Sequence, residues 1–258
     1  MSFRNYEVPA RDTVEDFYRM NHQRQTVEFV NQQHKRFVSC PEKTRTMTWL
    51  EALDYLDTLV DDSDPDTDLS QLQHLLQTAE AIRADGHEDW FVLTGFIHDL
   101  GKILCLSGQP QWAVVGDTFP VGCRYSEKIV YHSFFKHNPD AKNPVYQTEA
   151  GIYEPGCGLR NIRLSWGHDE YLYHCIKDYL PEPAQYMIRY HSFYAWHQAG
   201  AYDHLCDDHD RKMLSWVQKF NPYDLYSKAD QAVKWDQLRP YYLDLIEKYL
   251  PHKIQWPV

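Results

Sequence analysis

The chain has 258 residues, of which 43% are hydrophobic and 24% charged, so it is long enough for one large domain or two small ones. Its formal net charge of -11 at pH 7 argues against nucleic acid or an anionic membrane as a partner, because either would demand a basic surface. No linker divides the sequence, which favours a single domain over residues 1–258 that acts on a neutral or metal-chelating small molecule.

Apolar residues recur at spacings of three and four along most of the chain, as is typical of amphipathic helices. Strand-like alternation is nearly absent, so the predicted fold class is all-α. Pro222 is expected at a helix boundary and Pro240 in the first turn of the last helix, where proline is tolerated. The predicted helices cover 12–36, 47–60, 69–85, 89–106, 165–179, 183–199, 207–219 and 240–250.

The segment 107–164 differs from the rest because glycine and proline interrupt it repeatedly. An irregular stretch of this length inside a compact domain is usually functional or contains short elements. Its first part, 111–122, is predicted as a short strand followed by a loop over the site.

The sequence favours a cytoplasmic protein. No stretch is expected to reach the ~20 apolar residues of a membrane span, and the start lacks the apolar core of a signal peptide. The six cysteines show no Cys-x-x-Cys spacing, which indicates reduced, mostly buried thiols.

The pair His98-Asp99 lies in an apolar helical stretch and is followed by Gly101 and Lys102. An imidazole and a carboxylate would be costly to bury there unless they bound a cation between them. Lys102 comes one turn after His98, so its ammonium could lie near a metal-bound oxygen. The alternative for Lys102 is a surface position near a helix C-terminus, where the helix dipole favours a cation.

The dipeptide alone is weak evidence, because His-Asp also occurs at 168–169 and 209–210. Around His209 the sequence is almost wholly charged. This pattern predicts a solvated helix start with Asp207 or Asp208 as the N-cap.

Three further histidines intrude into predicted helices, namely His74, His168 and His191. A lone histidine in a core more often bonds a backbone carbonyl, but four of them in four helices indicate a shared metal site. Asp224 could cap a short helix or complete that set as an oxygen ligand.

The order His74, His98-Asp99-x-Gly101-Lys102, His168, His191, Asp224 resembles the HD-domain superfamily, and within it the myo-inositol oxygenase family. The resemblance implies an HD-type helical bundle with additional helices and a long irregular insertion. Longer blocks extend the likeness over nearly the whole chain, at 3–6, 59–66, 111–123, 165–171 and 239–242.

The resemblance also implies a cofactor of two non-haem iron ions, mixed-valent Fe(II)/Fe(III) when active, with Asp99 as the bridge. His74, His98 and Asp224 would complete one iron site, and His168 and His191 the other. Open positions would then remain for a chelating diol and dioxygen. The catalytic roles would fall to Lys102 and Asp99, and the substrate contacts to Arg4, Asp61, Asp62, Ser63, Lys102, Gly116, Asp117, His191 and Ser192.

The implied reaction is cleavage of the ring of myo-inositol by O2, giving D-glucuronate and water, in an enzyme expected to be monomeric. A contact from Arg4 would require the N-terminal segment to fold over the site. The acidic run 61–66 is also typical of a solvated turn.

Two alternatives stay open. An HD-type phosphohydrolase would use the same ligands to activate water, but would need basic residues around the metals, where mainly Lys102 and Arg189 are available. A metal-binding regulatory domain without turnover is disfavoured by the six candidate ligands.

Overall fold

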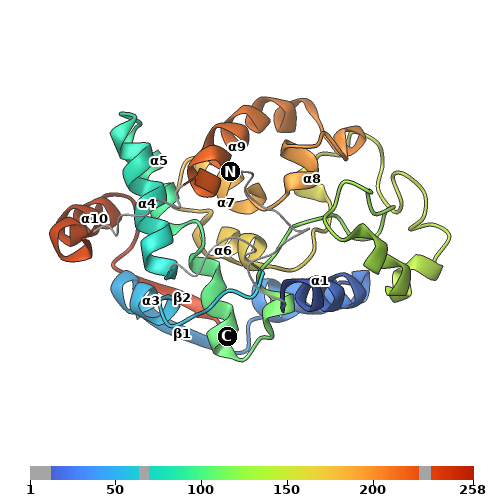
Figure 1. The fold of residues 1–258 in the computed structure, drawn as a ribbon, viewed down its shortest axis with the longest axis horizontal. Helices are drawn as coiled ribbons and strands as arrows, with labels where there is room; N and C mark the ends of the chain where they lie inside the picture. The colour runs from blue at the N-terminus through green and yellow to red at the C-terminus, as the bar shows by residue number, and fades with distance from the viewer. Residues whose placement is uncertain (1–12, 64–69, 227–233) are drawn as a thin grey trace.

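The structure is a computed structural model that describes residues 13–63, 70–226 and 234–258. Helices dominate it, which confirms the all-α class (Figure 1). The α-helices are α1 (Thr13–Arg24), α2 (Val27–His34), α3 (Trp49–Leu56), α4 (Gln71–Ala84), α5 (Asp89–Ile97), α6 (His168–Ile176), α7 (Glu182–Tyr190), α8 (Tyr194–His197), α9 (Asp208–Tyr226) and α10 (Trp235–Tyr249). Shorter helices are η1 (Lys35–Ser39), η2 (Leu100–Ser107), η3 (Gln111–Ala113), η4 (His132–His137), η5 (Pro139–Lys142), η6 (Leu159–Asn161) and η7 (Asp203–Leu205).

The predicted helix 12–36 is two helices, because the chain breaks at Gln25. The Thr26 hydroxyl caps α2 by accepting from the Phe29 N–H. The buried Gln25 side chain bonds both the N–H and the C=O of Trp166, at 2.9 and 2.7 Å. The break therefore fastens the N-terminal helices to the segment that leads into α6.

The prediction of a helix from residue 47 was wrong, because the chain there forms β1 (Thr44–Thr48). This strand pairs antiparallel with β2 (Lys253–Pro257), with Met47 opposite Ile254. Thr48 ends the strand and starts α3 through a capping box with Glu51. Each strand has only five residues, too few for a clear alternation.

Two of the prolines expected at helix boundaries lie inside helices. Pro222 is within α9, which runs to Tyr226, and Pro240 is in the second turn of α10. An interior proline costs about 3 kcal/mol. Helix α9 packs against α4, α5 and α7, and this tertiary contact offsets the cost.

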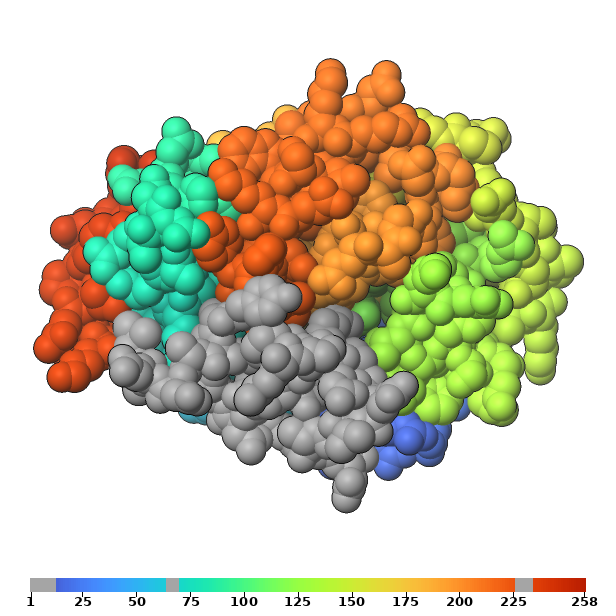
Figure 2. Space-filling view, turned by 45° about the horizontal axis from the view of Figure 1, so that its top comes forward, coloured from blue at the N-terminus to red at the C-terminus, as the bar shows by residue number. Residues whose placement is uncertain are grey.

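The irregular segment 108–164 forms the end of the molecule opposite α10, coloured green to yellow in Figures 1 and 2. The strand predicted within 111–122 is absent; the described chain there has the short helix η3 and a single bridge from Pro120 to Leu164. Side chains fasten the segment instead, as where the Asn138 amide donates to the carbonyls of His22 and Gln25. The helix pattern could not predict such contacts.

Two expectations about apolar groups need correction. The stretch Asp89–Ser107 is long and apolar enough to cross a membrane, but 72% of it is buried inside the protein, as expected of a core helix. All six cysteines are free thiols, but only Cys123 and Cys206 are buried, and Cys40 is exposed.

The charged run at the start of α9 is only partly solvated. Asp207 is its N-cap, since its carboxylate accepts from the N–H groups of His209 and Asp210. Asp210, expected in solvent, is fully buried and accepts from Leu159 N–H and the Tyr186 hydroxyl. Long-range partners make this burial possible.

Candidate metal centre

The six predicted metal ligands come together from five segments of the chain. His74 lies on α4, Asp99 and His98 at the junction of α5 and η2, His168 at the start of α6, and His191 directly after α7. Asp224, in the last turn of α9, completes the group and does not cap a helix. Helix α5 packs against α4, α7 and α9, and η2 packs against α6.

Asp99 stands between two pairs of histidines and points one oxygen at each. Its Oδ2 is 3.5 Å from His74 Nε2 and 3.6 Å from His98 Nε2. Its Oδ1 is 3.2 Å from His168 Nε2 and 3.5 Å from His191 Nε2. We call these the first and the second subsite.

Asp224 belongs to the first subsite. Its Oδ1 lies 3.1 Å from His74 Nε2 and 3.4 Å from His98 Nε2. These separations match those between neighbouring ligands that surround one metal ion with bonds of about 2 Å.

The backbone fixes three of the rings with Nε2 facing the centre. The Nδ1 atoms of His98, His168 and His191 each donate to a backbone carbonyl, of Gly95, Val114 and Ile188, at 2.9 Å. A ring that donates from Nδ1 keeps a lone pair on Nε2 for a metal, as is usual in protein metal sites.

The residues present fit a metal. Among the residues that the structure describes, the fully buried His98 Nε2 has no hydrogen-bond partner. A buried nitrogen without a partner is costly, and a metal ion between the ligands would satisfy it. Sets of ligand atoms within 4.8 Å of one another occur in both subsites.

The charges around Asp99 also favour a cation. Burial would raise the pKa of Asp99, but Lys102 and His98 outweigh it and hold the pKa well below its usual range. Burial lowers the pKa of His168, and Asp169 and Asp99 outweigh it and raise the pKa to about 10. The carboxylates that favour the protonated ring would equally favour a divalent ion, which would take the place of a proton on Nε2.

Lys102 lies at the edge of the centre, and its side chain is only 11% exposed, so it is not the solvated surface lysine of the alternative prediction. Its Nζ lies 2.8 Å from Asp99 Oδ2 and 2.8 Å from Asp61 Oδ2. The other oxygen of Asp61 accepts from the N–H and the hydroxyl of Ser63. The predicted site residues Asp61, Ser63 and Lys102 are therefore one connected chain that ends on Asp99.

The remaining predicted substrate contacts that the structure describes are Asp62, Gly116, Asp117 and Ser192. Asp117 is buried and accepts from the Tyr18 hydroxyl, and Gly116 beside it has a φ of +92°, which favours glycine. Ser192 directly follows His191, with its Oγ 3.5 Å from His168 Nε2. The Asp62 N–H donates to the side chain of Gln111. Arg4, expected to fold over the site, lies outside the described residues.

Asp169, which was not among the predicted site residues, also faces the second subsite. Its Oδ1 lies 2.7 Å from His168 Nε2, closer than any predicted ligand. The His-Asp dipeptide at 168–169 was the available signal, but the same dipeptide at 209–210 concealed it.

A further group of possible ligands joins Glu170 and His174 of α6 to His34, the last residue of α2. Arg189 pairs with both carboxylate oxygens of Glu170, at 2.6 and 2.9 Å, and holds its pKa well below the usual range although burial opposes this. The guanidinium already neutralises the carboxylate and would repel a metal ion. This group is therefore a structural ion pair.

Lowering the pH from 7 to 5 is expected to destabilise the fold partly through His34. Burial lowers the pKa of this ring to about 4 from 6.5, so the unfolded chain binds more protons between those values. The contribution of neutral His34 to the free energy of unfolding is complete above pH 6.5 and is lost as the pH falls toward 4. At pH 5 the loss is at most about 2 kcal/mol.

Urea unfolding at both pH values tests this. A His34→Gln variant should lose less stability than the wild type on acidification, whereas His137→Gln, which changes an exposed ring, should behave as the wild type does. Equal pH dependence in His34→Gln and wild type would contradict the expectation.

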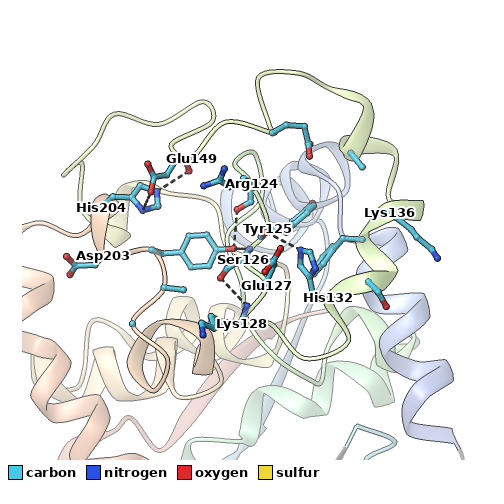
Figure 3. A pocket seen from close by; sticks show the side chains of 17 residues that line it. Arg124, Tyr125, Ser126, Glu127, Lys128, His132, Lys136, Glu149, Asp203 and His204 are labelled. Atoms are coloured by element: carbon cyan, nitrogen blue, oxygen red, sulfur yellow. Dashed lines mark hydrogen bonds and ion pairs between the residues drawn. The ribbon is translucent and has the colours of Figure 1, made fainter. Parts of the chain in front are cut away.

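A cavity of about 950 Å³ lies apart from the metal centre (Figure 3). Of the predicted site residues that the structure describes, none lines it. In Figure 3 Lys136 points away from the other labelled side chains, and His204 meets Glu149, whose carbonyl lies 3.0 Å from its Nε2. The lining mixes both charges, and we assign no substrate to it; the charged members are Arg124, Glu127, Lys128, Lys136, Glu149 and Asp203.

Comparison with known proteins agrees with this geometry. The family model described as myo-inositol oxygenase matches residues 11–256. Inositol oxygenase of Sus scrofa is 52% identical over 261 residues, which cover 99% of this chain and 92% of the relative. Inositol oxygenase 1 of Arabidopsis thaliana is 50% identical, covering 99% and 84%, and inositol oxygenase of Danio rerio is 49% identical, covering 98% and 93%. The chain belongs to the myo-inositol oxygenase family.

Proposed function

We propose that this chain is an oxidoreductase that cleaves the ring of myo-inositol with O2 to give D-glucuronate and water. The observation that carries this proposal is the shared carboxylate of Asp99, which faces a pair of histidines on each side. Two metal ions held side by side can bind a diol and O2 at neighbouring positions. Relatives at about half identity over nearly the whole chain bear the name inositol oxygenase.

The metal is proposed to be iron, two ions per chain and mixed-valent when active. His74, His98 and Asp224 would hold one ion and His168 and His191 the other, with Asp99 between them. Imidazole and carboxylate ligands suit iron. When bound, the pair would pass electrons from the substrate to O2 and provide a Lewis acid for the diol.

Lys102 is proposed to stabilise negative charge on a substrate oxygen. Burial would lower its pKa, but Asp61 and Asp99 outweigh this and raise the pKa well above its usual range. The amine therefore stays protonated and donates hydrogen bonds, so it does not serve as a base. A fixed cation is effective in such a water-excluded site.

Asp61 and Ser63 are proposed to act through Lys102, because both Asp61 oxygens are already bonded to Lys102 and Ser63. Asp62, Gly116, Asp117 and Ser192 remain the proposed contacts for the substrate hydroxyls. Polar groups matched to hydroxyls discriminate against analogues that lack them.

The phosphohydrolase alternative finds little support. Phosphate would need basic groups near the metals, but Arg189 is fully engaged with Glu170. Lys102 is paired with two carboxylates. We also propose a cytoplasmic location, since free thiols are usual in a reducing compartment.

An anaerobic assay tests the function. Iron-loaded protein should form D-glucuronate from myo-inositol and consume one O2 for each product, and should form none under argon. A phosphate ester serves as the control substrate and should stay intact with and without O2. Hydrolysis of that ester under argon, or full iron loading without any glucuronate, would reject the proposal.

Iron identity needs a separate measurement. Electron paramagnetic resonance of the partly oxidised protein should give a coupled mixed-valent signal that changes when myo-inositol is added. Only uncoupled iron signals, insensitive to the cyclitol, would argue against the paired centre.

A further inference from the structure

We infer that Asp169 is a seventh residue of the centre, whose carboxylate supplies negative charge that holds the metal of the second subsite. The inference rests on the proposed two-metal centre. It adds a terminal carboxylate to a subsite that otherwise has His168, His191 and the shared Asp99.

The distances show that Asp169 stands to the second subsite as Asp224 stands to the first. Asp169 Oδ1 is 2.7 Å from His168 Nε2 and 3.5 Å from His191 Nε2. Asp224 Oδ1 is 3.1 and 3.4 Å from its two histidines. Each subsite therefore has two imidazoles, one terminal carboxylate and one oxygen of Asp99.

The surroundings hold Asp169 in this position. Its Oδ2 accepts from the Thr118 hydroxyl at 3.1 Å and from the Ser192 N–H at 3.2 Å. The Ser192 hydroxyl is 3.3 Å from Oδ1. Two donors hold Oδ2 and the Ser192 hydroxyl donates to Oδ1, which also faces the two Nε2 atoms; neighbouring hydrogen bonds of this kind support metal-site residues.

A simpler role for Asp169 would be to complement the dipole of α6, since it lies in the first turn of that helix. First-turn carboxylates of that kind are normally solvated, whereas Asp169 is 0% exposed. Burying a charge is costly unless it is paired, and here the nearest group is His168 Nε2 at 2.7 Å, with His191 Nε2 at 3.5 Å from the same oxygen.

Metal binding by Asp169→Asn tests the inference. The amide keeps the shape of the side chain and removes its charge. Apo-protein is titrated with Mn²⁺ alone, and bound metal is counted. We expect the wild type to bind two ions, and Asp169→Asn to bind one normally and the second at least about tenfold more weakly.

Asp210→Asn is a matched control. Asp210 also follows a histidine in the first turn of a helix and is also 0% exposed, but none of the predicted ligands contacts it. This variant should bind two ions as the wild type does. Two Mn²⁺ ions bound with wild-type affinity by Asp169→Asn would overturn the inference.

Thr118→Val covers the case that Asp169→Asn does not fold. This variant removes the hydroxyl that holds Asp169 Oδ2 and keeps the charge of Asp169. It should therefore weaken binding of the second ion only. Unchanged binding of both ions would overturn the inference. The proposed function fails separately: wild type that binds two ions but does not oxidise myo-inositol would reject the reaction and leave Asp169 as a metal-site residue.

Discussion

Asp99→Asn is expected to remove the paired centre and to lower turnover by more than about 100-fold. Loss of a residue that only hydrogen-bonds a metal ligand typically costs roughly 10- to 100-fold, and Asp99 is proposed to hold the metals directly. The carboxylate is the only group that faces both histidine pairs among the described residues. An amide offers one oxygen and no charge, so it cannot serve both subsites. The change also leaves Lys102 with one carboxylate partner in place of two.

Asp224→Asn is the matched control for this prediction, because Asp224 faces the first subsite alone. It should lose one ion and keep the other, whereas Asp99→Asn should lose the coupling between ions altogether. Metal counting, the mixed-valent resonance signal and O2-dependent glucuronate formation are measured together. Two retained irons with normal turnover in Asp99→Asn would end the assignment of Asp99 as the bridge.

The four histidines and Asp99 stood out as candidate ligands because they are polar residues in predicted helices with apolar faces, whereas Asp224 was named only as a residue that could complete the set. His98 and Asp99 interrupt a stretch of large apolar residues, and that misfit with the helical pattern is readable without a structure. That the six candidate ligands meet at one point was predicted only from the family resemblance. Helix periodicity gives the face of each residue, but it does not give the packing of α4, α7 and α9 around α5 or of α6 against η2.

Asp169 was not predictable, and the reason is physical. The dipeptides at 168–169 and 209–210 look alike, and both aspartates are fully buried. Only their tertiary partners differ: His168 Nε2 and His191 Nε2 for Asp169, and the Tyr186 hydroxyl and Leu159 N–H for Asp210.

The predictions about the fold that were wrong failed for the same reason, because long-range contacts decide those parts of the structure. Strand β1 pairs with β2 near the far end of the chain, so neither strand is visible from local sequence. Pro240 stands inside α10 although the local rule places it in the first turn. The segment 108–164 is held by single side-chain bonds to distant backbone, such as those of Asn138.

Gly101→Ala is expected to destabilise the protein by about 3 kcal/mol, at the upper end for an overpacked core. A Cβ at this position would overlap the carbonyl oxygen of His168 and lie 2.8 Å from its carbonyl carbon. These are backbone atoms, so η2 and the start of α6 would have to separate. Because Asp99 precedes Gly101 and His168 begins α6, the separation should also weaken metal binding at the second subsite.

Gly108→Ala separates this steric effect from ordinary glycine loss. Gly108 ends the same helix η2 with a φ of +87°, and a Cβ there would meet nothing within 4 Å. This variant should lose only roughly 1–2 kcal/mol of stability, because alanine is strained in a left-handed backbone conformation, and it should still bind two Mn²⁺ ions. Urea unfolding of the apo-proteins and Mn²⁺ titration measure both effects. The expectation would be contradicted if Gly101→Ala were as stable as Gly108→Ala and still bound two ions. In that case the glycine would not be needed for the close approach of η2 to His168, and Asp99 would reach the second subsite without that approach.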